Sequence, residues 1–214
     1  MTKDLDPLPI EPIDKPLAED DFQLPPLPSS GKVALLGGSF HPPHVGHALL
    51  ALNILSVVDV DAVWVLPCAD HPFGKELAPF EHRKIMCELS FAHLPEVSVL
   101  DVESHMPTPS FTVQTIRALK KRLPNLLPSF VVGTDILDEL HLWREPDALQ
   151  EMCDLIVVPR GGHVTGEGRG KSSLELILPE VSSSEVRRRL KAGEDTSSLV
   201  DKKVLRYMRA HGLY

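Results

Sequence analysis

The sequence predicts an α/β fold, in which a doubly wound parallel β-sheet is covered by helices on both faces. Short runs of apolar residues, the first at residues 32–37, are typical of strands that are buried on both sides. Longer stretches with helical character alternate with these runs along the chain. Strands that alternate with helices form parallel sheets through right-handed crossovers. We therefore expect a Rossmann-like architecture.

Each predicted strand is an apolar run, several of them closed by glycine or proline. The six runs are residues 32–37, 62–66, 97–102, 130–133, 155–159 and 174–178. The helices are expected at residues 46–57, 80–93, 111–122, 136–140, 184–191 and 198–210. Pro79 is placed to start the second helix, Ser110 to cap the third, and Pro124 to end it.

Residues 1–30 differ in composition from the rest of the chain. Proline recurs there among acidic residues, without the periodicity of a helix or a strand. This segment is predicted to be a disordered or extended arm. Residues 31–214 are predicted to form one domain with a substantial core, because the chain is long enough and its 43 % apolar and 24 % charged residues are ordinary for a globular protein.

Charge and composition narrow the classes of function. A formal net charge of −8 disfavours a nucleic-acid binder, which needs a basic face to displace counterions from phosphates. No apolar run reaches the roughly 18–20 residues of a membrane-spanning helix, and the acidic, proline-rich start does not resemble a signal peptide. Cys68, Cys87 and Cys153 show neither disulfide nor metal-ligand spacing. We expect a cytoplasmic protein that binds neither nucleic acid nor membrane; homo-oligomer formation is left open.

The loop between the first predicted strand and helix carries the most informative motif. It runs Gly37-Gly38-Ser39-Phe40-His41-Pro42-Pro43-His44-Val45-Gly46-His47. Paired glycines let the backbone approach a ligand closely, and the amides of a helix N-terminus can bind phosphate. His44 and His47 lie three residues apart at the helix entrance, so both can face one anion. The histidines could instead bind a transition metal, but no carboxylate or cysteine partner lies nearby in the sequence. They could also be capping or core residues, but a loop rich in glycine and proline is a poor place for core histidines.

A second junction, Val181-Ser182-Ser183-Ser184-Glu185-Val186-Arg187, places consecutive hydroxyls before an arginine one turn into a helix. Helix amides and serine hydroxyls can converge on a phosphate there, and arginine can contact it through two N–H groups. An ordinary N-cap role explains Ser182 or Ser183 at least as well. Arg188 and Arg189 can equally be solvated surface residues.

In combination, these motifs resemble the nicotinate (nicotinamide) mononucleotide adenylyltransferase family of the His-x-Gly-His nucleotidyltransferase superfamily. The first loop resembles the family's Gly-Gly-Ser-Phe-x-Pro-x-His form, and the serine-rich junction resembles its Ile-Ser-Ser-Thr-x-Ile-Arg element. Further stretches match in order at residues 109–115, at residues 132–135 with Trp143, and at residues 207–214. The resemblance covers nearly all of residues 32–214 and identifies them as a nucleotidyltransferase domain.

The resemblance implies a role for each matching residue. His44, His47 and Arg187 would be catalytic and would contact the phosphates of ATP. The rest of the ATP site would comprise Gly37, Gly38, Ser39, Phe40, Lys75, Gly133, Asp135, Ser183 and Ser184. The pyridine pocket would comprise Phe111, Thr112 and Trp143. From the residues alone, core packing explains the two aromatics, an N-cap role explains Asp135, and simple exposure explains Lys75.

The implied reaction joins ATP and nicotinate mononucleotide to give deamido-NAD and pyrophosphate. The acceptor phosphate is already anionic, so alignment and charge neutralisation suffice without a base or a covalent intermediate. Mg²⁺ is expected to arrive with ATP, held mainly by phosphates and water, and no protein metal site is expected. The alternatives are another acceptor (nicotinamide mononucleotide, phosphopantetheine or an alcohol phosphate) and a non-catalytic nucleotide-binding regulator.

Three positions depart from the family pattern. His41 stands where asparagine or aspartate is usual, and Phe111 lacks the usual tyrosine hydroxyl. Residues 70–75 resemble the family's Pro-Pro-His-Lys loop only loosely. These departures bear on the acceptor more than on the reaction.

Overall fold

A computed structural model confirms the α/β class and the parallel sheet. The structure describes residues 22–70, 76–137, 139–159, 171–173 and 179–214. Six strands form one sheet in the order β3-β2-β1-β4-β5-β6, and all neighbouring strands in it are parallel. The strands are β1 (Lys32–Gly38), β2 (Ala62–Pro67), β3 (Val97–Val99), β4 (Leu127–Gly133), β5 (Asp154–Val158) and β6 (Lys171–Ser173).

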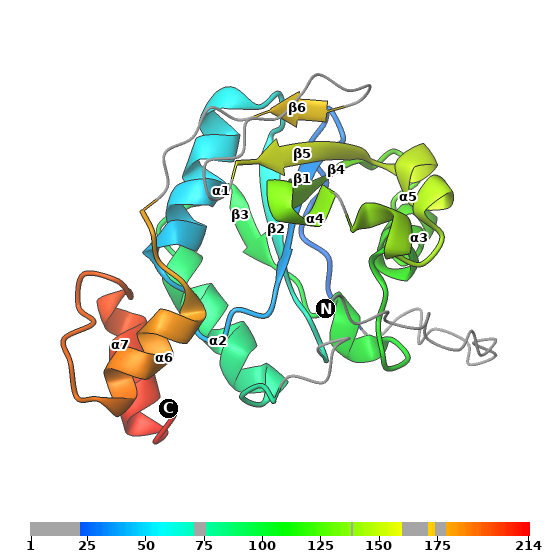
Figure 1. Cartoon of the computed structure of the whole chain (residues 1–214). Coiled ribbons are helices and arrows are strands. Elements are labelled where there is room, and N and C mark those ends of the chain that lie inside the picture. Colours follow the sequence, from blue (N-terminus) through cyan, green and yellow to red (C-terminus); the bar gives the residue numbers. More distant parts are fainter. Residues whose placement is uncertain (1–21, 71–75, 138, 160–170, 174–178) are drawn as a thin grey trace.

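Helices cover both faces of this sheet (Figure 1). In the described part of the chain, the α-helices are α1 (Val45–Val57), α2 (Phe80–Phe91), α3 (Thr112–Arg122), α4 (Thr134–Leu137), α5 (Pro146–Met152), α6 (Ser183–Lys191) and α7 (Lys202–Ala210). Two 3₁₀ turns, η1 (Val102–His105) and η2 (Leu140–Leu142), lie in the connections. α1 and α2 lie on one face, α3 and α5 on the other, and α6 and α7 stand beside α2.

Successive residues of β1, β2, β4 and β5 contribute to two separate cores, because side chains of a β-strand alternate between the faces of a sheet. On β2, Trp64 and Leu66 join the core under α3 and α5, whereas Val63 and Val65 join the core under α1 and α2. A third cluster, drawn from α2, α6, α7 and the segment before α7, attaches these last two helices to the domain. Burial on both faces explains why the strands are almost continuously apolar.

Several predicted boundaries were wrong. The third strand ends at Val99, and η1 begins at Val102. Phe111, not Ser110, is the N-cap residue of α3, and its amide donates to Gln114 Oε1 at 3.2 Å. The Ser110 hydroxyl donates to Glu103 Oε2 at 2.8 Å. The last helix begins four residues later than predicted, after an Asp201 N-cap.

One helix was missed, and one predicted strand cannot be compared. Helix α5 is short, with Pro146 in its first turn. The strand predicted at residues 174–178 lies outside the described residues, and β6 precedes it in the sequence.

The last part of the predicted arm packs on the domain. Phe22 is only 4 % exposed, and the Arg122 guanidinium lies 4.5 Å from the centre of its ring. Arg122 also donates to the Phe22 carbonyl at 2.7 Å. Residues 1–21, the greater part of that arm, lie outside the described residues.

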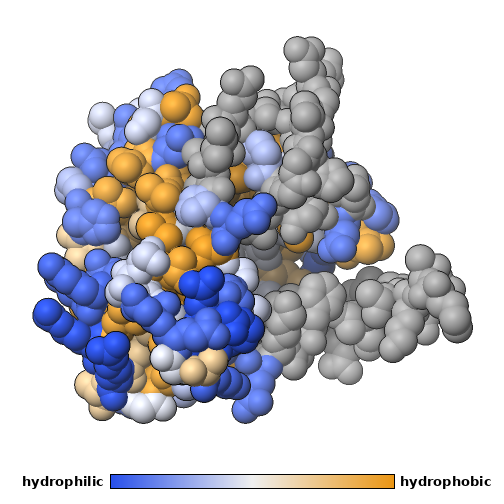
Figure 2. All heavy atoms as spheres, turned by 60° about the vertical axis from the view of Figure 1, so that its left-hand side comes forward, coloured by the Kyte–Doolittle hydropathy of each residue, from blue (hydrophilic) through white to orange (hydrophobic). Residues whose placement is uncertain are grey.

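The outer face of the domain near α1 is partly apolar. Leu49 and Leu52 of α1 are 40 % and 47 % exposed, and they border an open hollow whose far side includes His93 and Lys202. Figure 2 shows hydrophobic residues gathered on this side of the molecule, with hydrophilic residues below them. Within the part of the chain that the structure describes, no helix is both long and apolar enough to cross a membrane.

Candidate active site

The predicted nucleotide loop, residues 39–44, lies where the strand order of the sheet reverses. β1 pairs with β2 on one side and with β4 on the other, so the connections leaving β1 and β4 diverge to opposite faces. Ligands of doubly wound sheets bind at such a switch point, beyond the carboxyl ends of the strands. Gly37 and Gly38 are the last residues of β1, and Gly133 is the last residue of β4.

The two glycines of β1 leave little room for a side chain. A Cβ on Gly37 would lie 3.1 Å from Phe130 Cζ, and one on Gly38 would lie 3.2 Å from the Phe40 ring. Both distances are shorter than an ordinary carbon–carbon contact of about 3.5–4.0 Å. The absence of these methyl groups allows the loop after β1 to fold tightly over the end of the sheet.

Phe40 has a buried ring and a left-handed backbone. The ring is 1 % exposed and lies 4.8 Å from the His47 ring and 6.5 Å from the Phe91 ring, measured between centroids. Its φ of 45° is unusual for a residue with a side chain. The ring therefore belongs to the core under α1, and only the backbone at this position can lie along a nucleotide.

The two histidines of the motif meet at the first turn of α1. The His44 amide donates to His47 Nδ1 at 3.1 Å, and the two rings stack with centroids 3.8 Å apart. Because Nδ1 of His47 accepts this bond, the neutral ring carries its proton on Nε2. His44 is 8 % exposed and His47 is half-buried. The pair thus places an imidazole N–H group beside the backbone amides at the N-terminus of α1. Donors grouped in this way suit a phosphate.

The serine-rich start of α6 lies directly against this loop. Ser183 Oγ donates to the Pro42 carbonyl at 2.9 Å. Arg187 donates to the His41 carbonyl at 2.6 Å and to Ser184 Oγ at 3.3 Å. Two motifs about 140 residues apart in sequence are therefore neighbours, as the shared phosphate role requires. Ser182 takes the ordinary N-cap role, since its Oγ accepts the Glu185 amide at 3.1 Å.

Arg83 of α2 was not predicted as a site residue. Its side chain is 1 % exposed, and it donates to four backbone carbonyls: Ser39 at 3.0 Å, Cys68 at 2.7 Å, Ala69 at 3.1 Å and Ala78 at 2.8 Å. These carbonyls belong to the segments that follow β1 and β2 and that precede α2. The guanidinium therefore holds the nucleotide loop to the neighbouring connection.

A sequence signal for Arg83 existed. It shares one helix face with Phe80, Met86 and Cys87, so its position in the 3.6-residue period was that of a core residue. An arginine at such a position is buried only when its donors are satisfied.

The residues predicted for the pyridine pocket lie on the connections that follow β3 and β4. Phe111 immediately precedes α3, which begins at Thr112, and the Arg144 guanidinium lies 4.9 Å from the centre of the Phe111 ring. The neighbouring Trp143 is half-buried and meets Phe130 edge-on, with ring centroids 5.9 Å apart. Trp143 thus packs partly on the core, and the rest of its surface stays accessible.

Two further residues, Asp135 and Lys75, were predicted for the ATP site. Asp135 is the second residue of α4, so it does not stand at the N-cap of that helix. Lys75 lies outside the described residues.

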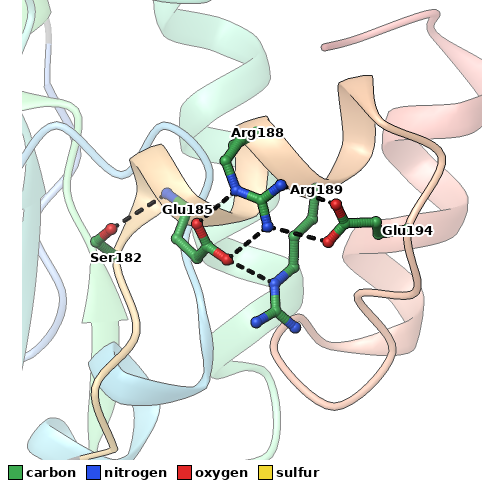
Figure 3. Close-up of polar contacts among 5 residues, drawn as sticks. All are labelled: Ser182, Glu185, Arg188, Arg189 and Glu194. Atoms are coloured by element: carbon green, nitrogen blue, oxygen red, sulfur yellow. Dashed lines mark hydrogen bonds and ion pairs between the residues drawn. The ribbon is translucent and has the colours of Figure 1, made fainter.

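A network of ion pairs stabilises α6 behind its serine-rich start (Figure 3). Glu185 accepts hydrogen bonds from Arg188 at 2.8 and 2.9 Å and from Arg189 at 2.7 Å. Arg188 also donates to both oxygens of Glu194, at 2.8 and 3.0 Å. The two arginines, which the sequence allowed to be merely solvated, are therefore engaged on the helix surface.

This network predicts a pH-dependent contribution to stability. Hydrogen bonds from Arg188 and Arg189 lower the pKa of Glu185 to about 2, from an ordinary value of 4.5. A carboxyl whose pKa is lower in the folded state stabilises it above the unfolded-state pKa, and this effect is lost as pH falls. Glu185→Gln should therefore lower the melting temperature slightly at pH 7, and its difference from wild type should shrink between about pH 4.5 and pH 2.

Melting curves at low and high salt test this expectation, because salt screens exposed ion pairs. Glu151→Gln, at an exposed glutamate of α5 outside this network, is the matched control. A difference between Glu185→Gln and wild type that stayed constant down to pH 2 would contradict the role of the ion pairs.

The chain is similar to known proteins in sequence and in fold. The cytidylyltransferase-like family matches residues 35–189. A protein of Anaeromyxobacter dehalogenans named "Probable nicotinate-nucleotide adenylyltransferase" is 44 % identical over 186 residues, with 86 % of this chain and 96 % of the relative covered. A protein of Thermus thermophilus with the same name is 36 % identical over 185 residues, with 86 % and 99 % covered.

A solved structure shares the fold. It is described as "Plasmodium falciparum nicotinic acid mononucleotide adenylyltransferase complexed with NaAD" and is similar with a TM-score of 0.72 at 21 % identity, covering 85 % of this chain and 96 % of the other. The family match and the curated relatives show that the chain belongs to the cytidylyltransferase-like family and, within it, to the nicotinate-nucleotide adenylyltransferases.

Proposed function

We propose that this protein transfers the adenylyl group of ATP to nicotinate mononucleotide, forming deamido-NAD and pyrophosphate. A phosphate oxygen of the acceptor attacks the α-phosphorus of ATP, and the bond from that phosphorus to the bridging oxygen of pyrophosphate breaks. The observation that carries the proposal is the contact between the nucleotide loop and α6. It joins His44, His47, Ser184 and Arg187 at the switch point of the sheet.

The side chains at this contact supply donors rather than a base. His47 Nε2–H, the amides at the start of α1 and the Arg187 guanidinium can stabilise the charge that develops on the α-phosphate and on the departing pyrophosphate. Ser183 is engaged with Pro42 and acts by holding the loop. Arg187 bridges the loop and Ser184, so α6 and α1 approach the triphosphate as one unit.

Mg²⁺ belongs to this proposal as a companion of ATP. Phosphate oxygens and water satisfy its octahedral preference, and the ion adds positive charge at the triphosphate. Among the described residues, no group of three or more His, Cys, Asp or Glu side chains is arranged to hold a metal ion. The groups that the site does offer, imidazole, hydroxyl and guanidinium, suit phosphates rather than Mg²⁺, which prefers carboxylate, carbonyl and water oxygens.

A positive charge beside the proposed pyridine pocket favours a carboxylated acceptor. Arg144 lies over the Phe111 ring and 3.9 Å from Glu145, which itself binds Arg117 at 2.6 Å. An arginine so placed can bind the carboxylate of nicotinate more strongly than the neutral amide of nicotinamide, because only the carboxylate carries a charge and two equivalent acceptor oxygens. We further propose that the protein acts in the cytoplasm and that ATP and a pyridine mononucleotide are its partners.

Pyrophosphate release from ATP, measured with a panel of acceptors, tests the proposed reaction. Nicotinate mononucleotide should be the preferred acceptor, above nicotinamide mononucleotide, phosphopantetheine and an alcohol phosphate. Trp143→Ala should raise KM for the pyridine nucleotide by about 2–10-fold, because one aromatic contact is lost, and leave KM for ATP unchanged.

Leu142→Ala is the matched control, because this neighbouring side chain is 69 % exposed. If another acceptor gave the faster ATP-dependent turnover, that acceptor would replace nicotinate mononucleotide as the proposed substrate. If no acceptor supported turnover, the proposal of an enzyme would be overturned. An unchanged KM for the pyridine nucleotide in Trp143→Ala would assign Trp143 to the core.

A further inference from the structure

We infer that His41 and Tyr214 form a positioning pair that holds the nucleotide loop, residues 39–44, in its working conformation. This inference rests on the proposed function of that loop. It assigns a role to the residue that departs from the family pattern, and to an aromatic residue that lies far from the loop in sequence.

The contacts of His41 join the loop to three other parts of the domain. The Tyr214 hydroxyl lies within hydrogen-bond distance of His41 Nδ1, at 3.0 Å, and the two rings meet edge-on with centroids 4.8 Å apart. The Ala78 amide, just before α2, donates to the same nitrogen at 3.0 Å. The His41 carbonyl accepts from Arg187 of α6 at 2.6 Å. One residue thus couples the loop to α2, to α6 and to the segment after α7.

Tyr214 is itself held by the domain. Its ring packs on the cluster formed by α2, α6 and α7, whose buried members include Met86, Val186 and Met208. Its backbone has a φ of 69°, which residues other than glycine rarely adopt. The hydroxyl is therefore presented to His41 from a ring that also packs on this cluster.

The direction of the hydrogen bonds requires a neutral His41. The Ala78 amide donates to Nδ1, so the imidazole proton lies on Nε2. The Tyr214 hydroxyl must then also act as a donor, and the two donors share the single lone pair of Nδ1. Burial, followed by the charges of Arg187, Arg83 and Lys191, lowers the pKa of His41 to about 4. Burial also raises the pKa of Tyr214, so that it remains a donor. These groups come from α2, α6 and the segment after α7, so the elements around His41 all favour the neutral ring.

The geometry also explains how histidine can replace asparagine or aspartate at this position. Nδ1 of histidine and Oδ1 of asparagine are both three bonds from Cα, and both accept hydrogen bonds. The amide oxygen introduced by His41→Asn can therefore receive the Ala78 and Tyr214 donors at nearly the same point. An alanine at this position cannot. His41→Asn is accordingly a rescue variant, and His41→Ala is the disruptive one.

Steady-state kinetics of pyrophosphate release on the full chain test the pair. Tyr214→Phe removes one hydroxyl and should lower kcat/KM for ATP by about fivefold, the effect of one lost hydrogen bond, without changing KM for the pyridine nucleotide. His41→Ala should cost more, and His41→Asn should stay close to wild type. The double variant His41→Ala with Tyr214→Phe should be no worse than His41→Ala alone, because the two residues act through one contact.

Tyr207→Phe is the matched control. Tyr207 makes the same kind of bond, to His82 Nδ1 at 2.8 Å, between α7 and α2 and away from the nucleotide loop. The Tyr207→Phe substitution should leave kcat/KM for ATP unchanged. Equal losses in Tyr214→Phe and Tyr207→Phe, or no loss in Tyr214→Phe while the wild type turns over, would overturn the positioning role.

A second readout separates this inference from the proposed function. Nitrogen chemical shifts of the His41 ring should show the Nε2–H tautomer in wild type and a change in Tyr214→Phe but not in Tyr207→Phe. If wild type released no pyrophosphate, the proposed reaction would fail, and calorimetric ATP binding to the same variants would still decide the role of the pair. Equal ATP affinity and an unaltered His41 ring in Tyr214→Phe would then refute it.

Discussion

Replacement of His47 by alanine is expected to lower kcat for pyrophosphate release by about 10²–10³-fold, the usual effect of removing one transition-state donor. His47 Nδ1 is occupied by the His44 amide, so its Nε2–H is the donor that the ring can offer to a phosphate. Its stacking on His44 and its contact with the buried Phe40 ring hold this N–H in one direction. Loss of the ring therefore removes an oriented donor, and added Mg²⁺ should not replace it.

A second variant separates the catalytic role of His47 from its role in capping α1. His47→Asn keeps an acceptor for the His44 amide but offers no group at the position of Nε2. It should recover most of the stability that His47→Ala loses, about 1 kcal/mol for a helix cap, without recovering kcat. Urea unfolding and single-turnover pyrophosphate release measure the two effects. Turnover close to wild type in either variant would remove His47 from the catalytic site.

Replacement of Arg83 by methionine is expected to have the largest effect on stability, a loss of about 3–5 kcal/mol. Methionine fills much of the same space, yet it leaves the four carbonyls that Arg83 binds without their donors in a buried place. A domain with a total stability of about 5–15 kcal/mol loses a large part of it in this way. Urea unfolding followed by circular dichroism measures the change.

Arg122→Met is the matched control for Arg83. Arg122 is exposed and donates to a single carbonyl, that of Phe22, while it covers one aromatic ring. We expect it to cost about 1 kcal/mol, the net value of one hydrogen bond. Arg83→Lys keeps the positive charge with fewer donors and should fall between wild type and Arg83→Met. A stability of Arg83→Met similar to that of Arg122→Met would contradict the proposed clamp.

The order of elements was predictable from the sequence because it depends on local patterns. Apolar runs and amphipathic stretches alternate, and parallel strands can be joined only by crossovers. The same reasoning placed Gly37, His44 and His47 at the exit of the first strand, where a strand–loop–helix junction concentrates backbone donors. The predicted cap at Ser110 failed because α3 begins one residue later, after Phe111, and the Ser110 hydroxyl instead contacts Glu103, a residue of a different element.

By itself, the sequence determined that this chain is a doubly wound α/β protein. It also predicted a phosphate-binding loop after the first strand, and its motifs pointed to adenylyl transfer. These conclusions depend on residue type and short spacing, which the primary sequence contains directly. Only the tertiary structure decided that Arg83, Arg187 and Tyr214 converge on that loop, and that the Phe40 ring belongs to the core. Those residues come from separate elements, and the packing of α2, α6 and α7 brings them together, since hydrogen bonds act over about 3 Å of space whatever the distance along the chain.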